Sequence, residues 1–506
     1  MLEVLGIINS LTSINAPTIL HAIPVNRVFM KISLHTYIFI AILHDAAATS
    51  KLNEVASYDF FVDNNGRPDY IFIGGEMKML SIAKELQPDI VKFRRDFHKY
   101  PELGWTEFRT ASIVAKTLEE NGFGIIIGED AMDGSMMKNL LPADELESQM
   151  KRALAQGAHA QYLEKMRGGK TAVVGVLDTG RPGAVIAMRF DMDALPIQEL
   201  QTDSHFPARE GFASVNDGVM HSCAHDGHTA VGLGMAMALA KVRDKLTGVI
   251  KLIFQPAEEG VQGGATSIIK KGLIDDVSHM LSFHIGLAAR TGEIYCQTTD
   301  FFAITEYHVD FTGKEAHAAA NPELGKSALL AAAAATMGLQ GIYRHSAGAS
   351  RINVGMLASG QKSNIVPNKA VMKLETRGAT TEINNFMKRE AERVINAAAQ
   401  MYDVRPSIRY GGESITAVCD PSVTQATKQI AQELGIFEHV KDILSLNASE
   451  DYTYFMEYVQ NRGGVAGHFI AGANLDSKHH TIGFNFDEDV LWRVVALLGA
   501  LVFKFA

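Results

Sequence analysis

The chain has 506 residues, of which 47% are hydrophobic and 21% are charged, and its net charge is −10. This composition is typical of a globular protein, and the length is sufficient for two domains with separate cores. The acidic balance, without any long basic run, excludes nucleic acid as an expected partner. Three widely spaced cysteines make no disulfide framework, which predicts a reducing, cytoplasmic location.

The first 80 residues lack the periodicity of the remainder. Arg27 and Lys31 precede an apolar run at 37–43, which is the layout of an export signal. That run is too short to span a bilayer, so no membrane association is expected. Residues 58–75 are typical of a hairpin. We interpret residues 1–80 as an appendage translated from a wrongly assigned start, and a genuine export signal is the alternative.

Regular elements are expected from about residue 81 onward. Apolar residues at helical spacing predict two helices separated near Pro101, and charged residues at 144–166 predict a surface helix. Helices alternating with apolar strands then predict an α/β sheet that carries helices on both faces. These later elements are strands at 173–177 and 185–190 around a turn at 178–183, a helix at 225–241 and a strand at 249–254.

The pattern changes between about 298 and 411. The expected order is strand, helix, strand, strand, helix, at 307–312, 327–337, 352–356, 371–376 and 383–401. This order predicts a small inserted α+β domain of ferredoxin-like type. The predicted organisation is therefore an N-terminal extension (1–80), a catalytic domain in two parts (81–297 and 412–506) and an inserted lid or dimerisation domain (298–411).

Cys223 and His225 lie two residues apart, just before the helix predicted at 225–241. In an extended segment alternate side chains share a face, so both could reach one metal centre. A thiolate can bridge two cations, and ligation keeps it deprotonated. The alternative is a buried cysteine beside a histidine that caps a helix.

Glu258 and Glu259 follow the apolar strand at 249–254, and the carboxyl ends of such strands are where ligand sites gather. Two adjacent carboxylates repel each other unless something positive lies nearby; a solvated strand end is the alternative. His284 also ends an apolar stretch, and a histidine pair stands at 479–480. Together these residues supply the sulfur, nitrogen and oxygen donors that transition metals select, with one carboxylate to spare as a proton acceptor.

Ten short segments occur in a characteristic order: 94–98, 188–196, 221–228, 255–260, 283–284, 313–317, 363–367, 375–377, 449–451 and 479–480. This set resembles the M20 family of metallopeptidases, and more narrowly its amidohydrolase branch, in which Cys replaces the usual bridging Asp. The resemblance extends from residue 81 to the end of the chain. The segments at 144–166, 178–183 and 479–480 further resemble enzymes that split p-aminobenzoyl-glutamate, a folate breakdown product.

The resemblance implies a role for each metal-ligand candidate. Cys223 would bridge two divalent ions, His225 and His284 would complete one site, and Glu259 and His480 would complete the other. His480 is preferred to its neighbour because it stands four residues before Phe484, as the family pattern has it. The family favours Mn²⁺, and the mixed ligand set also admits Zn²⁺ or Co²⁺.

The catalytic roles come from the same resemblance. Glu258 would be the general base. His317 of the inserted domain would reach the neighbouring subunit's site to stabilise the oxyanion, while Asn364 and Arg377 would hold the substrate. These roles imply a homodimer, or a heterodimer with a related chain.

Three points stay open at this level. His228 and Asp226 lie on the helix after the cysteine and are expected to have supporting roles. Either Asp191 or Asp193 could orient a ligating imidazole. The branch usually has Gly between Cys and His, where this chain has Ala224; a positive φ there would cost Ala about 1 kcal/mol or more.

The expected activity is metal-dependent hydrolysis of the amide bond of an N-acyl amino acid, with p-aminobenzoyl-glutamate as the expected substrate. One alternative is a hydrolase of other N-acyl amino acids or small peptides, such as hippurate, because the catalytic residues would be the same. The other is a non-catalytic chain that assembles with a partner hydrolase.

Overall fold

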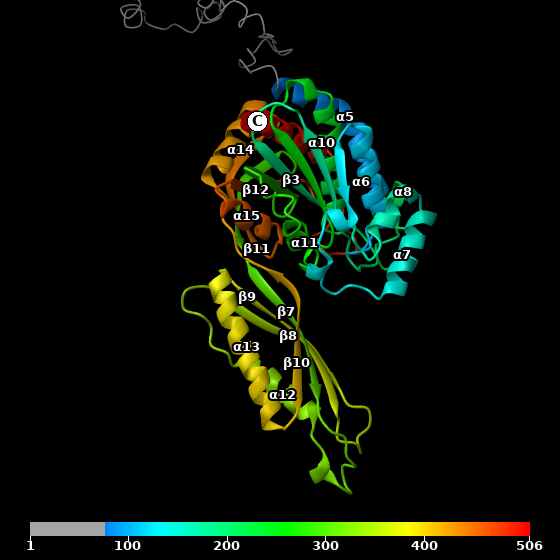
Figure 1. Cartoon of the computed structure of the whole chain (residues 1–506), viewed down its shortest axis with the longest axis vertical. Coiled ribbons are helices and arrows are strands. Elements are labelled where there is room, and N and C mark those ends of the chain that lie inside the picture. The colour runs from blue at the N-terminus through cyan, green and yellow to red at the C-terminus, as the bar shows by residue number, and fades with distance from the viewer. Residues whose placement is uncertain (1–75) are drawn as a thin grey trace, which may run out of the picture. The chain divides into compact units, whose positions relative to one another are not determined.

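The computed structural model describes residues 76–506, which lie in one compact unit covering residues 75–506. The predicted export signal, the hairpin at 58–75 and most of the predicted appendage therefore lie outside the described residues. None of the helices within 76–506 has both the length and the apolar character that crossing a membrane requires. The described residues build two β-sheets, of eight and four strands (Figure 1).

The larger sheet has the strand order β1-β2-β4-β3-β5-β12-β6-β11. Its centre is parallel, because β3 pairs in parallel with β4 and β5, and β12 with β5. The pairs β1–β2, β2–β4 and β12–β6 are antiparallel, and β11 pairs in parallel with β6 at the edge. The mixed α/β sheet expected from the sequence is confirmed. The strands are β1 Gly124–Ile127, β2 Val173–Asp178, β3 Val185–Asp191, β4 Val249–Gln255, β5 His279–Ile285, β6 Glu293–Phe301, β11 His439–Ala448 and β12 Val465–Ala471.

Helices cover both faces of this sheet, because successive side chains of a buried strand point to opposite sides. Along β3, Ile186 and Met188 join one apolar cluster and Ala187 joins another. The first cluster packs beneath α5 (Glu76–Lys99), α6 (Phe108–Glu120), α10 (His225–Ala240), α14 (Pro421–Leu434) and α16 (Val490–Phe505). The second packs beneath α11 (Gly264–Lys270) and α15 (Tyr452–Gln460).

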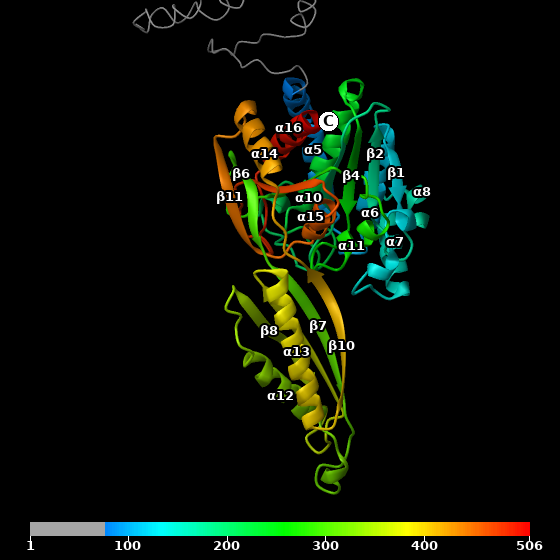
Figure 2. The ribbon, with the colours of Figure 1, turned by 60° about the vertical axis from the view of Figure 1, so that its left-hand side comes forward.

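Beyond its first turn, helix α10 is apolar all round because other elements enclose it on every side. It packs against α5, α16 and β3, and α5 also lies beside α16 (Figure 2). Gly232 permits this close approach: a Cβ there would lie 2.6 Å from the ring of Phe254 and 2.8 Å from that of Phe190. The helix thereby holds its first residue, His225, over the carboxyl ends of the central strands.

The smaller sheet is antiparallel, with the strand order β10-β7-β9-β8. Two helices lie along one of its faces (Figure 1). Along the chain the order is strand, helix, strand, strand, helix, strand, which is the ferredoxin-like arrangement. The elements are β7 Ala303–Thr312, α12 Ala328–Gln340, β8 Ser350–Ser359, β9 Lys369–Gly378, α13 Thr381–Met401 and β10 Arg405–Ser414.

Two details differ from the predicted elements. The surface helix expected at 144–166 is divided into α7 (Ala143–Ala155) and α8 (Ala160–Leu163), because Gly157 between them has a φ of 98°. The strands expected on either side of the 178–183 turn are present as β2 and β3, and in the sheet β4 lies between them. Position 298 lies inside β6, which belongs to the larger sheet.

Candidate metal centre

Five candidate site residues lie close to the carboxyl ends of the parallel strands. Glu258 and Glu259 follow β4, and His284 is the next-to-last residue of β5. Cys223 stands two residues before His225, the first residue of α10. The carboxyl edge of an open α/β sheet is where side chains from separate strands converge. The fold therefore brings distant parts of the sequence to one place.

The donor atoms form two groups that share one sulfur. Cys223 Sγ lies 3.5 Å from His284 Nε2 and 3.4 Å from His480 Nε2. His480 Nε2 lies 3.3 Å from Glu259 Oε1. Within 4.8 Å of one another are the donors of Cys223, His225 and His284, and likewise those of Cys223, Glu259 and His480. These are the two groups expected from the sequence.

Both the spacing and the chemistry of the donors fit two divalent cations. Ligand atoms around a tetrahedral ion with bonds of about 2.0–2.3 Å stand roughly 3.3–3.7 Å apart, as several of these atoms do. Glu259 Oε1 is buried, and no hydrogen bond from the described residues reaches it although His480 Nε2 is close. A buried carboxylate oxygen in this state is stabilised by a cation.

The buried thiol and carboxylates of the centre would repel one another if all of them were deprotonated. Burial, and then the nearby Glu259 and Glu258 carboxylates, raise the pKa of the Cys223 thiol well above its ordinary value. Burial likewise raises the pKa of Glu258 well above its ordinary value, and Glu450 and Glu259 add to this effect. Positive charge at the centre offsets this repulsion.

Backbone carbonyls orient two of the imidazole rings. His225 Nδ1 lies 2.9 Å from the carbonyl oxygen of Asp193, and His284 Nδ1 lies 2.9 Å from that of Ile285. An Nδ1–H that donates to a carbonyl leaves the Nε2 lone pair free for a cation. The choice left open between Asp191 and Asp193 thus has a structural answer, because the Asp193 main chain orients His225.

The carboxylate of Asp193 has a second task. It accepts hydrogen bonds from the backbone N–H groups of Glu258, at 3.1 Å, and Glu259, at 2.8 Å. One oxygen of the Asp191 carboxylate lies 2.6 Å from Nδ1 of His228, and the other lies 3.7 Å from Nε2 of His225. Asp193 therefore connects His225, through its carbonyl, with the loop that carries both glutamates, through its carboxylate.

The two adjacent C-terminal histidines face different surroundings. His480, with a φ of 60°, brings Nε2 to Cys223 and Glu259. His479 instead packs on Phe484, and its Nε2 lies 3.2 Å from the Ile285 carbonyl oxygen. The preference for His480 as the donor agrees with this geometry.

Beneath Glu258 lies a buried charge cluster whose members come from two of the characteristic segments, although their mutual contact was not predicted from the sequence. Arg189 on β3 donates hydrogen bonds to Asp191, Glu450 and Asp451 at 2.5, 2.9 and 3.0 Å. All four side chains are buried. An arginine inside an otherwise apolar strand was the available signal, because a charge there must find partners. The cluster fixes the Glu450 carboxylate that raises the pKa of Glu258.

Asp226 belongs to another buried network, on the α5 side of α10. Its Oδ2 accepts from Arg94 Nε at 2.9 Å and lies 2.8 Å from His98 Nδ1. Glu199 lies on the other ring nitrogen of His98, at 2.9 Å. These contacts attach α10 to α5, which agrees with the supporting role expected for Asp226.

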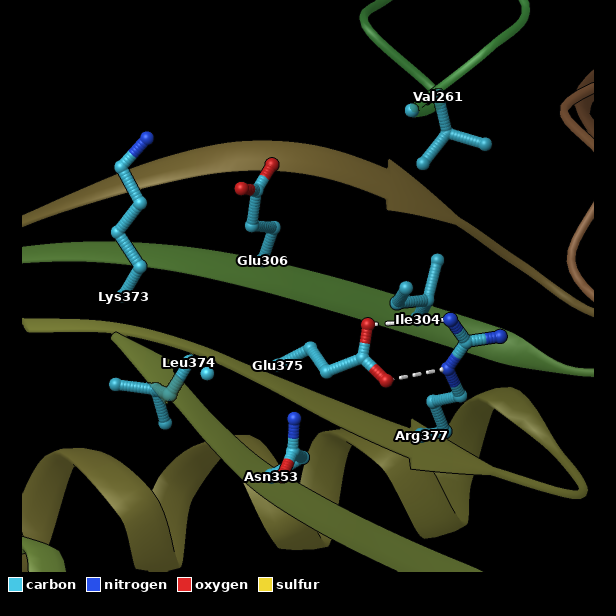
Figure 3. A pocket seen from close by; sticks show the side chains of 10 residues that line it. Val261, Ile304, Glu306, Asn353, Lys373, Leu374, Glu375 and Arg377 are labelled. Atoms are coloured by element: carbon cyan, nitrogen blue, oxygen red, sulfur yellow. Dashed lines mark hydrogen bonds and ion pairs between the residues drawn. The ribbon is translucent and has the colours of Figure 1, made fainter. Parts of the chain in front are cut away.

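A cavity of about 330 Å³ lies between the glutamate loop and the four-stranded sheet. Its lining includes Gly260 and Val261 from the loop and Glu306, Glu375 and Arg377 from the sheet (Figure 3). The Arg377 guanidinium is bonded through two nitrogens to Glu375, at 2.8 and 3.1 Å. The arginine expected to hold substrate thus faces a cavity that begins next to the glutamates.

His317 and Asn364 lie together, away from the other candidates. Both are exposed, and the backbone of 317 pairs with that of 365 in an isolated bridge. His317 Nδ1 accepts from the N–H groups of Ala319 and Ala320. Among the described residues, no hydrogen bond or ion pair joins His317 or Asn364 to the Cys223 centre.

Comparison with known proteins gives concordant matches. The sequence profile described as Peptidase family M20/M25/M40 matches residues 187–504. One subunit of the p-aminobenzoyl-glutamate hydrolase of Escherichia coli (strain K12) is 44% identical, over 84% of this chain and 97% of that protein. The indole-3-acetyl-aspartic acid hydrolase of Enterobacter agglomerans is 43% identical, over 83% and 97%. The crystal structure of an aminobenzoyl-glutamate utilization protein from Klebsiella pneumoniae superposes with a TM-score of 0.72 at 37% identity, covering 84% and 97%.

Proposed function

The chain belongs to peptidase family M20/M25/M40 and is a hydrolase of amide bonds, and we propose that it releases an acidic amino acid from its N-acyl derivative. We favour p-aminobenzoyl-glutamate as the substrate. Two relatives at 44% and 43% identity support this class, because both are named for amides of a dicarboxylic amino acid, glutamate in one and aspartate in the other.

The cofactor is a set of divalent metal ions, and the proposal assigns two to each chain. Cys223 would bridge them, with His225 and His284 on one side and Glu259 and His480 on the other. The observation that carries this assignment is the pair of donor groups sharing one sulfur. We expect Mn²⁺, with Zn²⁺ or Co²⁺ as alternatives that the mixed donors accept. Bound ions supply Lewis acidity and lower the pKa of a bound water to about 7 in favourable cases.

Glu258 is the proposed general base. Its Oε2 lies 3.9 Å from His225 Nε2, at the edge of the centre, while Glu259 contacts His480. Glu258 takes the proton of the attacking water and then delivers it to the departing nitrogen. The low exposure of Glu258 favours a carboxylate that accepts a proton readily.

Two further groups hold the substrate and the developing charge. Arg377 can clamp a substrate carboxylate through parallel hydrogen bonds, as it now clamps Glu375. Asn364 is the second proposed substrate contact, and His317 is the proposed donor to the oxyanion. Such a donor is typically worth about 3–4 kcal/mol in the transition state.

His317 is proposed to act on a neighbouring chain of the assembly. Ile304, near the start of β7, lines the same cavity as the glutamate loop. The strand has ten residues and leads away from that loop, so a residue beyond its end lies about 30 Å from the glutamates. A homodimer, or a heterodimer with a related chain, would return this histidine to an active centre. The E. coli relative is named as one component of a hydrolase with subunits, which favours the second arrangement. A cytoplasmic location is also proposed, since all three cysteines are free.

The test is the substitution Glu258→Gln. We expect kcat for p-aminobenzoyl-glutamate to fall about 100- to 10,000-fold, because proton transfer is lost. Metal analysis of the purified variant should still find two ions per chain, since none of the five donors has changed. A variant that keeps a tenth or more of the wild-type kcat would contradict the role of Glu258.

A substrate panel separates this proposal from its rivals. Indole-3-acetyl-aspartate tests the class suggested by the second relative, and hippurate tests monocarboxylic N-acyl amino acids. Faster hydrolysis of hippurate than of both dicarboxylic substrates would refute the substrate class. Wild-type protein without bound metal and without activity on the whole panel would instead favour a non-catalytic partner chain.

A further inference from the structure

The loop that carries Glu258 and Glu259 has an unusual backbone. Ala257, Gly260 and Val261 have φ values of 54°, 76° and 48°. Glycine adopts such values freely, but a β-branched residue such as valine does so rarely. Conformations of this kind persist only where the surroundings hold them. The loop therefore depends on contacts outside itself.

Part of that support comes from strand β10, where the chain leaves the four-stranded sheet. The N–H of Glu413 donates to the carbonyl of Val261 at 3.2 Å. Gly412 approaches so closely that a Cβ there would lie 1.8 Å from the carbonyl oxygen of Gly260. The register of β10 against β7 shifts between Tyr410 and Glu413, and such an irregularity redirects the strand. The irregularity thus brings β10 onto the glutamate loop.

Lys138, in the segment before α7, supplies further support, in addition to the Asp193 carboxylate that accepts from the N–H groups of both glutamates. Its N–H donates to the carbonyl of Gln262 at 2.9 Å, just beyond the strained residues. Its ammonium donates to Oε2 of Glu413 at 2.5 Å, and Lys388 of α13 donates to Oε1 at 2.8 Å. Trp105 Nε1 donates to the Lys138 carbonyl at 2.8 Å, which fixes the main chain of this residue. Both oxygens of Glu413 are therefore occupied by lysines from different parts of the fold.

These three side chains are each about one-quarter exposed. An isolated pair at such a position contributes little to folding stability. Here, however, main-chain and side-chain contacts of the same two residues, Lys138 and Glu413, hold the loop from two directions. We therefore interpret the pairing of both lysines with Glu413 as a means of holding the loop, and not mainly as a contribution to the folding stability of the whole protein.

We propose that Glu413, clamped by Lys138 and Lys388, is a positioning residue for the loop that carries the general base Glu258. The clamp acts on the reaction through Val261 and the loop, without touching the substrate. Because Glu413 and Lys388 belong to the four-stranded domain, the position of Glu258 also depends on how that domain is oriented. The inference rests on the proposed amide hydrolysis.

The test compares Glu413→Gln and Lys138→Met with wild type on p-aminobenzoyl-glutamate. Misplacement of a catalytic group by about 1 Å can cost roughly 100-fold in rate, so we expect kcat to fall about 10- to 100-fold in both variants. KM should change less than kcat, because Arg377 and the residues of the four-stranded sheet that line the cavity are unaltered. Lys138→Arg should keep most of the kcat that Lys138→Met loses, since it retains a cation that pairs with the Glu413 carboxylate.

The matched control is Glu390→Gln, which removes the ion pair with Arg393 on the same α13 helix, away from the loop. It should leave kcat unchanged. The double variant Lys138→Met/Glu413→Gln should be little slower than either single variant, because both break one clamp. Metal content should remain two ions per chain throughout.

Unchanged kcat in both clamp variants, with or without a lower melting temperature, would overturn the inference and leave the network a structural one. A loss of kcat equal to that of the Glu390→Gln control would do the same. Failure of the proposed function is distinguishable, because it would appear as an inactive wild type or a fully active Glu258→Gln enzyme.

Discussion

Ala224 shows how much a single backbone conformation decides at the metal centre. Its φ is 69°, in the left-handed region, and it separates the bridging candidate Cys223 from His225. The turn allows the thiol to face the centre while the next residue begins α10. Gly is the residue expected there, so the alanine of this chain bears a strain of about 1 kcal/mol. The side chain is fully buried, so no larger residue fits without movement.

This backbone requirement predicts that valine at position 224 is strongly destabilising and that glycine there is tolerated. Ala224→Val should lower the free energy of unfolding by at least about 2 kcal/mol, because a β-branched side chain is both strained at this φ and too large for the site. Ala224→Gly should change it by less than about 1 kcal/mol, because relief of strain is offset by the lost methyl burial. Urea unfolding of the purified variants measures both values. Equal stability of the Ala224→Val variant and the wild-type protein would mean that the backbone there is not left-handed.

At this scale, residue types, spacing and the family resemblance predicted which residues are the candidate donors, but not how their side chains are oriented. The choice between Asp191 and Asp193 could not be made from sequence, because the decisive group is a main-chain carbonyl. The strain at Val261 was also hidden, since valine ordinarily favours extended backbone. The buried partners of Arg189 lie about 260 positions away in sequence, beyond any local pattern.

Among the elements, α10 is the one whose placement the centre depends on. The sequence predicts this helix at 225–241, and the structure has it at His225–Ala240. Local periodicity was sufficient for the helix, whereas the order of strands beneath it was not predictable. Strand β4 lies between β2 and β3, although the latter two are consecutive in sequence. Pairing between distant strands depends on the whole sheet, so a local turn signal at 178–183 cannot reveal it.

Close packing of α10 gives a prediction for Gly232. Gly232→Ala should lower the free energy of unfolding by about 1–3 kcal/mol, because its Cβ would overlap the rings of Phe190 and Phe254. Alanine's better helix propensity, about 1 kcal/mol, acts in the opposite direction but is smaller than a clash with two packed rings. Gly483→Ala is the control, since its Cβ would meet only Ser477 at 3.8 Å. A Gly232→Ala protein as stable as this control would show that α10 can move away from the sheet.

For the whole molecule, the separation of His317 from the metal centre has a consequence for activity. The proposed mechanism needs an oxyanion donor, yet His317 lies beyond the far end of β7, with Nδ1 held by the backbone of its own loop. A single chain would then lack one catalytic group. Activity should therefore depend on assembly, and it should be recoverable by combining chains with different defects.

Mixed dimers test this dependence directly. Glu258→Gln and His317→Ala chains should each form nearly inactive homodimers. In a mixed dimer, one of the two sites joins an intact Glu258 to an intact His317 from the other chain. In a two-fold dimer each site takes its His317 from the other chain. Random assembly of equal amounts makes about half of the dimers mixed, and one of the two sites in each mixed dimer is intact, so about a quarter of wild-type activity should be restored. Co-expression with two affinity tags isolates the mixed species, whose activity per dimer should be about half that of wild type. Mixed dimers no more active than the two parents would contradict exchange of His317 between two copies of this chain; His317 would then serve its own chain, a related chain or no site at all.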